Sequence, residues 1–545
     1  MQSAIDSVDK WSHAYGLQLS SKKTKAMITS YRHANNPIAL KLGNQDIEYV
    51  SNFKFLGVIF DKRLTWQPHI NKLKERCQKD LNLLRIISSD KNSCDYKTLR
   101  TFYSSLIQSK LDYASFLMIN AANTHLLKLD RIQYAGARIM LGVLRNTPTF
   151  KLEIEANLIP LKIRRKKLLT EYGTRISMLN GHPVRNYMLK YIPIYKLMSE
   201  NYKFSALDNL CNEFDKLGIN SKNLPIIPIK YKYNFNYNII NAKTSLVDCK
   251  KENRSDDQWK ILHRAMINDK YPNHVKIYTD GSRKNNKTGC GVRSEMSQVT
   301  CRLPDYSSIF TAEMHSIKIA IEQAKSKNAN YLILTDSLSV LQAMKGQDPT
   351  KHHILADIFQ ILENNKGNIV LEWIPSHVGI KGNEKADQLA NLGTALPIIK
   401  EIPHSKKEMK KLIYEKCQNE WKNEWEKLSP ALIKFKEKPE QTAYIEQIRK
   451  IQVVMTRLRM GVTYWTHGHI FNKTLPNNCK KCNETASLKH IFIDCKELNK
   501  SRQKLQKHCE DKNIVYEMGN IFSPPVEPAQ IIKFLEDAEI PTKDI

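Results

Sequence analysis

The stretch Val275-Lys276-Ile277-Tyr278-Thr279-Asp280-Gly281-Ser282 combines an apolar strand pattern with an acid near its end. A second apolar run, Tyr331-Leu332-Ile333-Leu334-Thr335, leads into another acid, Asp336. Short apolar runs of this kind predict buried strands, the first ending in an Asp-Gly-Ser turn. Acids at the ends of adjacent buried strands would be held at one rim of a sheet, so Asp280 and Asp336 are expected to lie close together.

Two predicted helices and a loop contribute further polar groups. Residues 312–321 carry apolar side chains at helical spacing and contain Glu313. A second helix is predicted to open at Gly382 and to contain Asp387. The sequence Ser-His-Val-Gly just before it predicts a loop that bears His377. A helix that crosses the rim of the sheet can add its acid to those of the strands.

Clustered carboxylates suit the hydrolysis of a phosphodiester. Mg²⁺ prefers oxygen ligands and retains several waters, so a few carboxylates and the substrate phosphate suffice to hold it. Two such ions about 3.5–4 Å apart can activate a water and stabilise the leaving oxygen. A turn aspartate or a solvated helix glutamate explains any one of these acids well, but it explains the ordered set of four poorly.

The segment resembles a type 1 ribonuclease H domain in the order Thr-Asp-Gly-Ser, Ala-Glu, Thr-Asp-Ser and His-x-Gly-x-x-Gly-Asn-Glu-x-Ala-Asp. The resemblance implies a mixed sheet flanked by helices that cleaves the RNA strand of an RNA–DNA hybrid. It implies that Asp280, Glu313, Asp336 and Asp387 bind two Mg²⁺ (or Mn²⁺) ions. It also implies that His377 lies on a mobile loop and assists proton transfer or product release.

Composition indicates a nucleic-acid-binding protein of several domains. The chain has 545 residues, 41% of them hydrophobic, and a formal net charge of +30. The positive excess favours RNA and RNA–DNA hybrid as partners. Most of the eleven cysteines are scattered, as in reduced intracellular proteins. No apolar run approaches the ~18 residues of a membrane span, which predicts a soluble intracellular protein, in nucleus or cytoplasm, with no membrane partner. Nothing identifies a protein partner.

The first part of the chain resembles a second family. Residues 16–25 read Gly-Leu-x-Leu-x-x-x-Lys-Thr-Lys after a predicted helix, and residues 55–61 read Phe-Leu-Gly-Val-x-Phe-Asp within a strand predicted over 53–61. Both blocks resemble the end of the palm in the reverse transcriptase of jockey-like non-LTR retrotransposons. The metal-binding aspartate pair of that family lies upstream of these blocks, and Asp256-Asp257 follows Asn-Arg-Ser instead of an apolar strand. The resemblance therefore implies a truncated palm, and reverse transcriptase activity is not expected.

Together the patterns predict a multidomain α/β protein in six segments. These are a palm remnant of α+β type (1–67), a helical thumb or connection (68–190), a linker (191–269), a ribonuclease H type 1 domain (270–397), a helical tail with a zinc-knuckle-like motif (398–500) and a C-terminal extension (501–545).

The tail contains the motif Cys479-x2-Cys482-x7-His490-x4-Cys495. Three thiolates and one imidazole suit a structural, tetrahedral Zn²⁺. Neighbouring lysines are expected to keep the thiolates ionised, and the apolar residues 491–493 to pack the knuckle onto the helix that follows. The seven-residue spacing departs from the four residues of retroviral zinc knuckles. The alternative is a small helical hairpin with free thiols.

Two functions from different classes follow from these patterns. The first is an enzyme, a ribonuclease H within the C-terminal part of a retrotransposon polyprotein. The second is a catalytically silent remnant that binds RNA or DNA through its basic segments. The intact set of four acids favours the enzyme.

The charge predicts a steep salt dependence of binding. A chain of net charge +30 should bind hybrid or RNA mainly through phosphates, releasing counterions. Its affinity is then expected to fall by about 10³-fold or more between roughly 50 and 200 mM salt if several phosphates are neutralised. Fluorescence anisotropy across that range measures the slope, and a flat response would point to base stacking instead.

Overall fold

The computed structural model describes residues 1–29, 38–89, 94–179, 181–188, 206–219, 224, 240–247, 254–324, 329–346, 348, 352–364, 368–428, 448–522, 526–542 and 545. About half of the linker predicted over 191–269 lies outside these residues, and the described half contains helices at Ala206–Lys216 and Asp256–Lys270. The chain forms two compact units, one of residues 1–168 and 417–545 and one of residues 169–416. Each is described by itself below.

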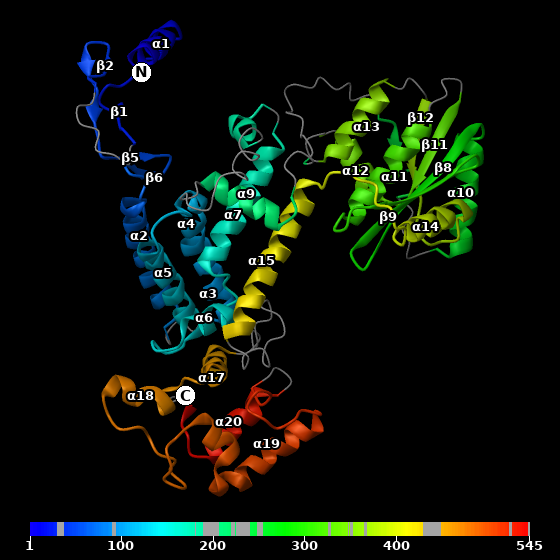
Figure 1. Ribbon diagram of the computed structural model, residues 1–545. Helices are drawn as coiled ribbons and strands as arrows, with labels where there is room; N and C mark the ends of the chain where they lie inside the picture. The colour runs from blue at the N-terminus through cyan, green and yellow to red at the C-terminus, as the bar shows by residue number, and fades with distance from the viewer. Residues whose placement is uncertain are drawn as a thin grey trace. The chain divides into compact units, whose positions relative to one another are not determined.

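A six-stranded mixed sheet organises the second unit (Figure 1). The strand order is β10-β9-β8-β11-β12-β7. Neighbours β8, β9 and β10 are antiparallel, whereas β8, β11, β12 and β7 run parallel. The bounds are β7 Ala242–Lys243, β8 His274–Lys284, β9 Lys287–Ser294, β10 Gln298–Leu303, β11 Asn330–Thr335 and β12 Asn368–Trp373.

Helices cover both faces of this sheet, which explains its nearly continuous apolar strands. In β11, Ile333 packs into a core shared with α11 and α13, while Leu332 and Leu334 pack into a core shared with α10. Helix α14 contacts β8, β9 and β10. The helices of this unit are α9 Ala206–Lys216, α10 Asp256–Lys270, α11 Ile309–Gln323, α12 Leu338–Lys345, α13 His353–Asn364 and α14 Lys381–Gly393.

The predicted turn after Asp280 is wrong, because β8 continues through Gly281 and Ser282 to Lys284. Residues 277–284 of β8 pair with the whole of β9, and this pairing keeps the chain extended past Asp280. Glycine at 281 serves packing rather than a turn. A Cβ there would lie 2.8 Å from Glu313 N and 2.9 Å from Ala312 Cβ. Only glycine lets α11 approach β8 this closely.

Small β-structures open the first unit. Helix α1 (Gln2–Ala14) precedes three two-stranded pairs, formed by β1 with β4, β2 with β3 and β5 with β6. The single strand predicted over 53–61 is wrong, because the chain turns back at Leu56-Gly57. Both residues have positive φ, 46° and 86°, as two-residue hairpin turns require. The strands are β1 Lys25–Ala26, β2 Lys41–Leu42, β3 Gln45–Asp46, β4 Glu48–Tyr49, β5 Asn52–Phe55 and β6 Val58–Asp61.

A helical bundle follows these β-structures. Helices α2 (Gln67–Ile87) and α5 (Asn123–Leu141) pack through an apolar core that includes Leu81 and Met140. The further helices are α3 Tyr96–Phe102, which continues as a π-helical turn at Tyr103–Gln108, α4 Ser109–Asp112, a 3₁₀ turn at Ser115–Met118, α6 Thr149–Glu155 and α7 Leu161–Ser177.

The tail begins with α15 (Lys406–Leu428), close to the helix predicted over 405–428. The helix predicted over 440–460 is described as α17 (Arg449–Met460), and residues 440–447 lie outside the described residues. Helices α18 Tyr464–Asn472, α19 Asn499–Asp511 and α20 Pro528–Asp537 follow, with short turns at His490–Asp494 and Lys496–Leu498. In the described part of the chain, no helix has the length and apolarity needed to cross a bilayer. The predicted multidomain α/β class is confirmed.

The close packing of α14 on β9 is predicted to require glycine at the contact positions of β9. A Cβ at Gly291 would lie 2.5 Å from Ala390 N and against Ala386 O, both backbone atoms that cannot rotate away. Gly291→Ala is therefore expected to cost about 1–3 kcal/mol or more in unfolding free energy, measured by urea denaturation.

Gly468→Ala in α18 is the matched control. The nearest atom to a Cβ there, Tyr464 Cδ1, is 3.9 Å away, so this helix position should gain up to about 1 kcal/mol. Equal effects of the two substitutions would contradict the packing argument.

Candidate active site

Three of the four predicted acids meet at one rim of the sheet. Asp280, Glu313 and Asp336 each offer a carboxylate oxygen, and these oxygens all lie within 4.8 Å of one another. Asp280 comes from the middle of β8, Glu313 from α11, and Asp336 directly follows β11. Strand β11 pairs with β8 in parallel, with Thr335 opposite Thr279. This register brings Asp336 level with Asp280.

The close contact at Gly281 positions Glu313. Helix α11 begins after Ser308, whose side chain accepts a hydrogen bond from Thr311 N at 3.1 Å. Since α11 rests on the bare Cα of Gly281, the first turns of the helix carry Glu313 to the side of Asp280.

Asn383 supports the third acid and was not singled out by the sequence analysis as a site residue. Its Nδ2 donates to Asp336 Oδ2 at 3.2 Å, and its side chain is buried in α14. Trp373 Nε1, at the end of β12, donates to the backbone carbonyl of Asp336 at 3.1 Å. Asn383 lies within the quoted Gly-Asn-Glu motif. The motif therefore marked this position, but it did not indicate the hydrogen bond to Asp336.

Burial and mutual repulsion of the carboxylates raise the pKa values of the three acids. Burial, followed by the charge of Asp336, raises the pKa of Asp280 to about 8. Burial and then Asp280 hold the pKa of Glu313 well above its usual range. Burial also raises the pKa of Asp336, while the hydrogen bond from Asn383 opposes that rise. Like charges brought together out of water favour the protonated forms unless a cation joins them.

A divalent cation fits this donor set. Glu313 Oε2 is buried and has no hydrogen-bond partner in the described structure, which is costly for a carboxylate oxygen. Converging carboxylate oxygens are the ligands that Mg²⁺ and Mn²⁺ favour. A bound cation would supply the missing partner of Glu313 and relieve the repulsion among the three acids.

Asp387 and His377 lie at the margin of the cluster. Asp387, on α14, is half-buried, and its charge raises the pKa of both Asp280 and Asp336. Its Oδ1 accepts a hydrogen bond from Asn391 Nδ2 at 2.9 Å. His377 is exposed on the loop between β12 and α14, with a left-handed φ of 53°. Its charge, when present, lowers the pKa of Asp336.

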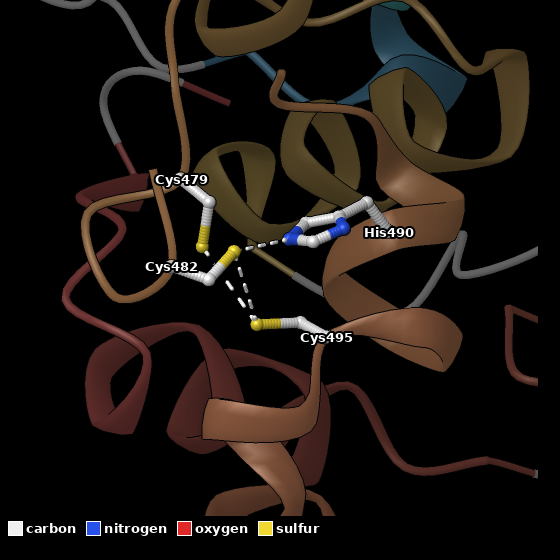
Figure 2. A group of neighbouring side chains, drawn as sticks. All are labelled: Cys479, Cys482, His490 and Cys495. Atoms are coloured by element: carbon white, nitrogen blue, oxygen red, sulfur yellow. Dashed lines mark hydrogen bonds between the residues drawn. The ribbon is translucent and has the colours of Figure 1, made fainter. Parts of the chain in front are cut away.

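The second predicted group, in the tail, also comes together. Figure 2 shows Cys479, Cys482, His490 and Cys495 pointing toward one another. The Sγ atoms of Cys479 and Cys495 are 3.9 Å apart, and those of Cys482 and Cys495 are 3.8 Å apart. Cys482 Sγ lies 3.1 Å from His490 Nε2. The four side chains thus surround one point in space.

The backbone around Cys479 shapes this site. Cys479 N donates to Glu484 O at 2.7 Å, and Asn483 N donates to Cys479 O at 2.8 Å, which folds the segment into a tight turn. Burial raises the pKa of the Cys479 thiol, but the N–H groups of Cys482 and Lys481, together with the side chains of His490 and Cys482, bring the pKa down to about 7. Of the lysines expected to help ionise the thiols, Lys480, Lys481 and Lys489, the ammonium of Lys481 bonds Glu539.

The predicted apolar packing of the knuckle is present. Phe492 is fully buried, with ring centroids 4.9 Å from Phe522 and 4.8 Å from Phe534 on α20. Arg502 Nη1 donates to Ile493 O at 2.7 Å and links the knuckle to α19. The cluster is therefore fixed to the helices of the tail.

Comparison with known proteins gives the class of the α/β domain. Residues 272–395 match the family RNase H. Human ribonuclease H1 is 33% identical over 141 residues, which cover 22% of this chain and 49% of that protein. Ribonuclease H of Pseudomonas entomophila is 30% identical over 139 residues, covering 22% of this chain and 92% of that protein. The chain belongs to the ribonuclease H family.

A second similarity covers more of the chain. The RNA-directed DNA polymerase from mobile element jockey of Drosophila melanogaster is 21% identical over 183 residues, which cover 34% of this chain and 20% of that protein. The resemblance to jockey-like retrotransposon proteins is confirmed. The chain spans about half the length of the human ribonuclease H1 that it matches.

The raised pKa values predict that cation binding responds to pH. With a pKa of about 8, Asp280 holds its proton at neutral pH when no cation is bound. A cation needs the ionised carboxylate, so affinity for Mn²⁺ should rise as pH increases toward about 8 and fall below it. Titrations of Mn²⁺ at several pH values measure this.

Surface acids provide the control for that titration. Asp305 is exposed and paired with Arg302 at 2.9 Å, so Asp305→Asn should leave the pH dependence unchanged. A Mn²⁺ affinity that stays constant between about pH 6 and 9 would contradict the coupling to proton release.

Proposed function

We propose that the ribonuclease H region hydrolyses the RNA strand of RNA–DNA hybrids. The observation that supports this proposal is the meeting of Asp280, Glu313 and Asp336 at the rim of the sheet. The relatives named ribonuclease H support the reaction type. In the setting of a retrotransposon protein, such a domain would degrade template RNA after synthesis of the first DNA strand.

Four acids would hold two Mg²⁺ or Mn²⁺ ions. In this proposal Asp280, Glu313 and Asp336 form the buried part of the ligand set, and Asp387 adds a fourth carboxylate from α14. Bound divalent cations supply Lewis acidity for an attacking water and for the leaving oxygen. Asn383 keeps Asp336 oriented through its hydrogen bond at 3.2 Å. Gly281 keeps Glu313 within reach.

His377 would move protons. Its ring is exposed, so it exchanges protons readily with solvent. The electrostatic influence of His377 on the pKa of Asp336 supports a place for it near the reacting phosphate. The left-handed backbone at His377 and the positive φ of Gly379, 75°, define a tight loop. In the proposed reaction His377 assists proton transfer or product release and binds no cation.

Substitution of the acids tests the activity. Asp336→Asn replaces an anionic ligand by a neutral amide, so cleavage of a labelled RNA–DNA hybrid in Mg²⁺ should fall below detection. His377→Ala should slow cleavage less, by about 10²-fold, the lower end of the range for positioned proton transfer. Product formation is followed with the full chain by gel electrophoresis.

Asp305→Asn again serves as the matched control, because it neutralises an acid of the same domain outside the cluster. Cleavage that survives Asp336→Asn, or survives EDTA, would overturn the proposed site. Binding of hybrid without any cleavage by the unaltered chain would establish the alternative, a catalytically silent nucleic-acid-binding remnant.

We further propose that the tail cluster holds one structural Zn²⁺. A tetrahedral zinc with Zn–S near 2.3 Å sets its sulfurs about 3.8 Å apart, and the measured separations are 3.8 and 3.9 Å. His490 Nδ1 lies 3.1 Å from Glu484 Oε2, the carboxylate partner that orients many zinc-bound histidines. Four protein ligands leave no open position, which favours a structural role.

Elemental analysis under reducing conditions tests the zinc site. The double variant Cys482→Ser/Cys495→Ser is expected to lose one zinc per chain relative to the unaltered protein and to destabilise the tail. Cys509→Ala, which removes a buried thiol of α19 outside the cluster, should keep that zinc. An unchanged zinc content in the double variant would leave the hairpin with free thiols as the better description.

A further inference from the structure

A third group of ligand atoms lies in the α/β domain. Cys290 on β9, Cys301 on β10 and His315 on α11 each offer one ligand atom, and these atoms all lie within 4.8 Å of one another. The proposed hydrolysis uses none of the three. Their positions differ by 11 to 25 in the sequence, with no spacing typical of a metal motif.

Strand pairing explains why the two thiols meet. Cys290 and Cys301 are directly opposite each other in the antiparallel pair of β9 and β10. Directly opposite residues point to the same face of a sheet. The adjacent Gly289 and Gly291 face α14, where a Cβ would meet its backbone. The two cysteines therefore face the other side, where α11 packs and Cys290 joins its apolar core.

His315 supplies an independent sign of a missing partner. Its side chain is 4% exposed, and its Nε2 is buried with no hydrogen-bond partner in the described structure. A buried polar nitrogen in this condition is costly unless something binds it. A cavity of about 460 Å³ reaches His315 and is also lined by Lys318, His353 and Lys400. The cavity is lined by His315 but by neither cysteine, so it lies on the imidazole side of the group.

We propose that Cys290, Cys301 and His315 form a second site for a thiophilic divalent cation, of which Zn²⁺ is the natural probe. Two sulfurs and an imidazole are ligands that zinc prefers over magnesium. Three protein ligands leave a fourth position for water. A disulfide between Cys290 and Cys301 is the competing arrangement, but it would leave the His315 nitrogen without a partner.

The site would stabilise the edge of the sheet. Strand β10 is the outermost strand beside β9, and Cys301 on it is only half-buried. A cation held by the three residues joins β10, β9 and α11 at one point. A cation that binds only the folded state raises the stability of that state by mass action. The expected consequence is a higher melting temperature of this domain in Zn²⁺, independent of nuclease activity.

The experiment uses the full chain carrying Cys482→Ser/Cys495→Ser, with excess Mg²⁺ present for the carboxylates and a reductant for the thiols. After Zn²⁺ loading and desalting, this protein should retain one zinc per chain. Alkylation of Cys301, mapped by mass spectrometry, should be slower with zinc than after chelation. Adding Cys301→Ala should remove the zinc, whereas Cys94→Ser, at another half-buried free thiol, should not.

Retention of no zinc by the tail variant, or retention that Cys301→Ala leaves unchanged, would overturn the proposal. A Cys290–Cys301 disulfide would overturn it as well, if it persists in the folded protein despite the reductant. It would be detected as a mass two hydrogens lower, which reductant restores once the chain is unfolded. If the tail variant does not fold, the same substitutions are made in the otherwise unaltered chain. There, Cys301→Ala should lower zinc from two to one per chain, and a content that stays at two would reject the second site.

Discussion

The close approach of two helices to the sheet is the constraint on which the rest of the α/β domain depends. Helix α11 rests on Gly281 and helix α14 on Gly291, at distances that a Cβ would make impossible. Protein interiors are close-packed and do not yield by an ångström without cost. Because the helices are fixed this tightly, Glu313 from one and Asn383 from the other reach the same cluster of acids.

The tight packing of the two helices matters because the cluster of acids is electrostatically unfavourable by itself. Asp280, Glu313 and Asp336 are brought together with raised pKa values, and Glu313 Oε2 lacks a partner. Such an arrangement persists only where the surrounding packing imposes it, which is characteristic of functional sites. The stability of the fold thus maintains a cluster of acids that is ready for cations.

Sulfur ligands in the chain are organised in two different ways. In the tail, a tight turn around Cys479 and a short helical segment from His490 bring the ligands together over 17 residues. In the α/β domain, pairing of two strands places Cys290 opposite Cys301, and a helix adds His315. The first arrangement is local and is visible as a spacing, whereas the second depends on strand register and helix packing.

The sequence by itself determined the elements whose signals are local. Apolar periodicity gave the strands before Asp280 and Asp336 and the helices that carry Glu313 and Asp387, and ligand spacing gave the tail cluster. Only the tertiary structure decided that β8 continues past Asp280, because its pairing with β9 overrides the turn preference of Asp-Gly-Ser. It alone revealed the role of Asn383 and the meeting of Cys290, Cys301 and His315. These features arise from contacts between residues distant in the chain, which no local pattern encodes.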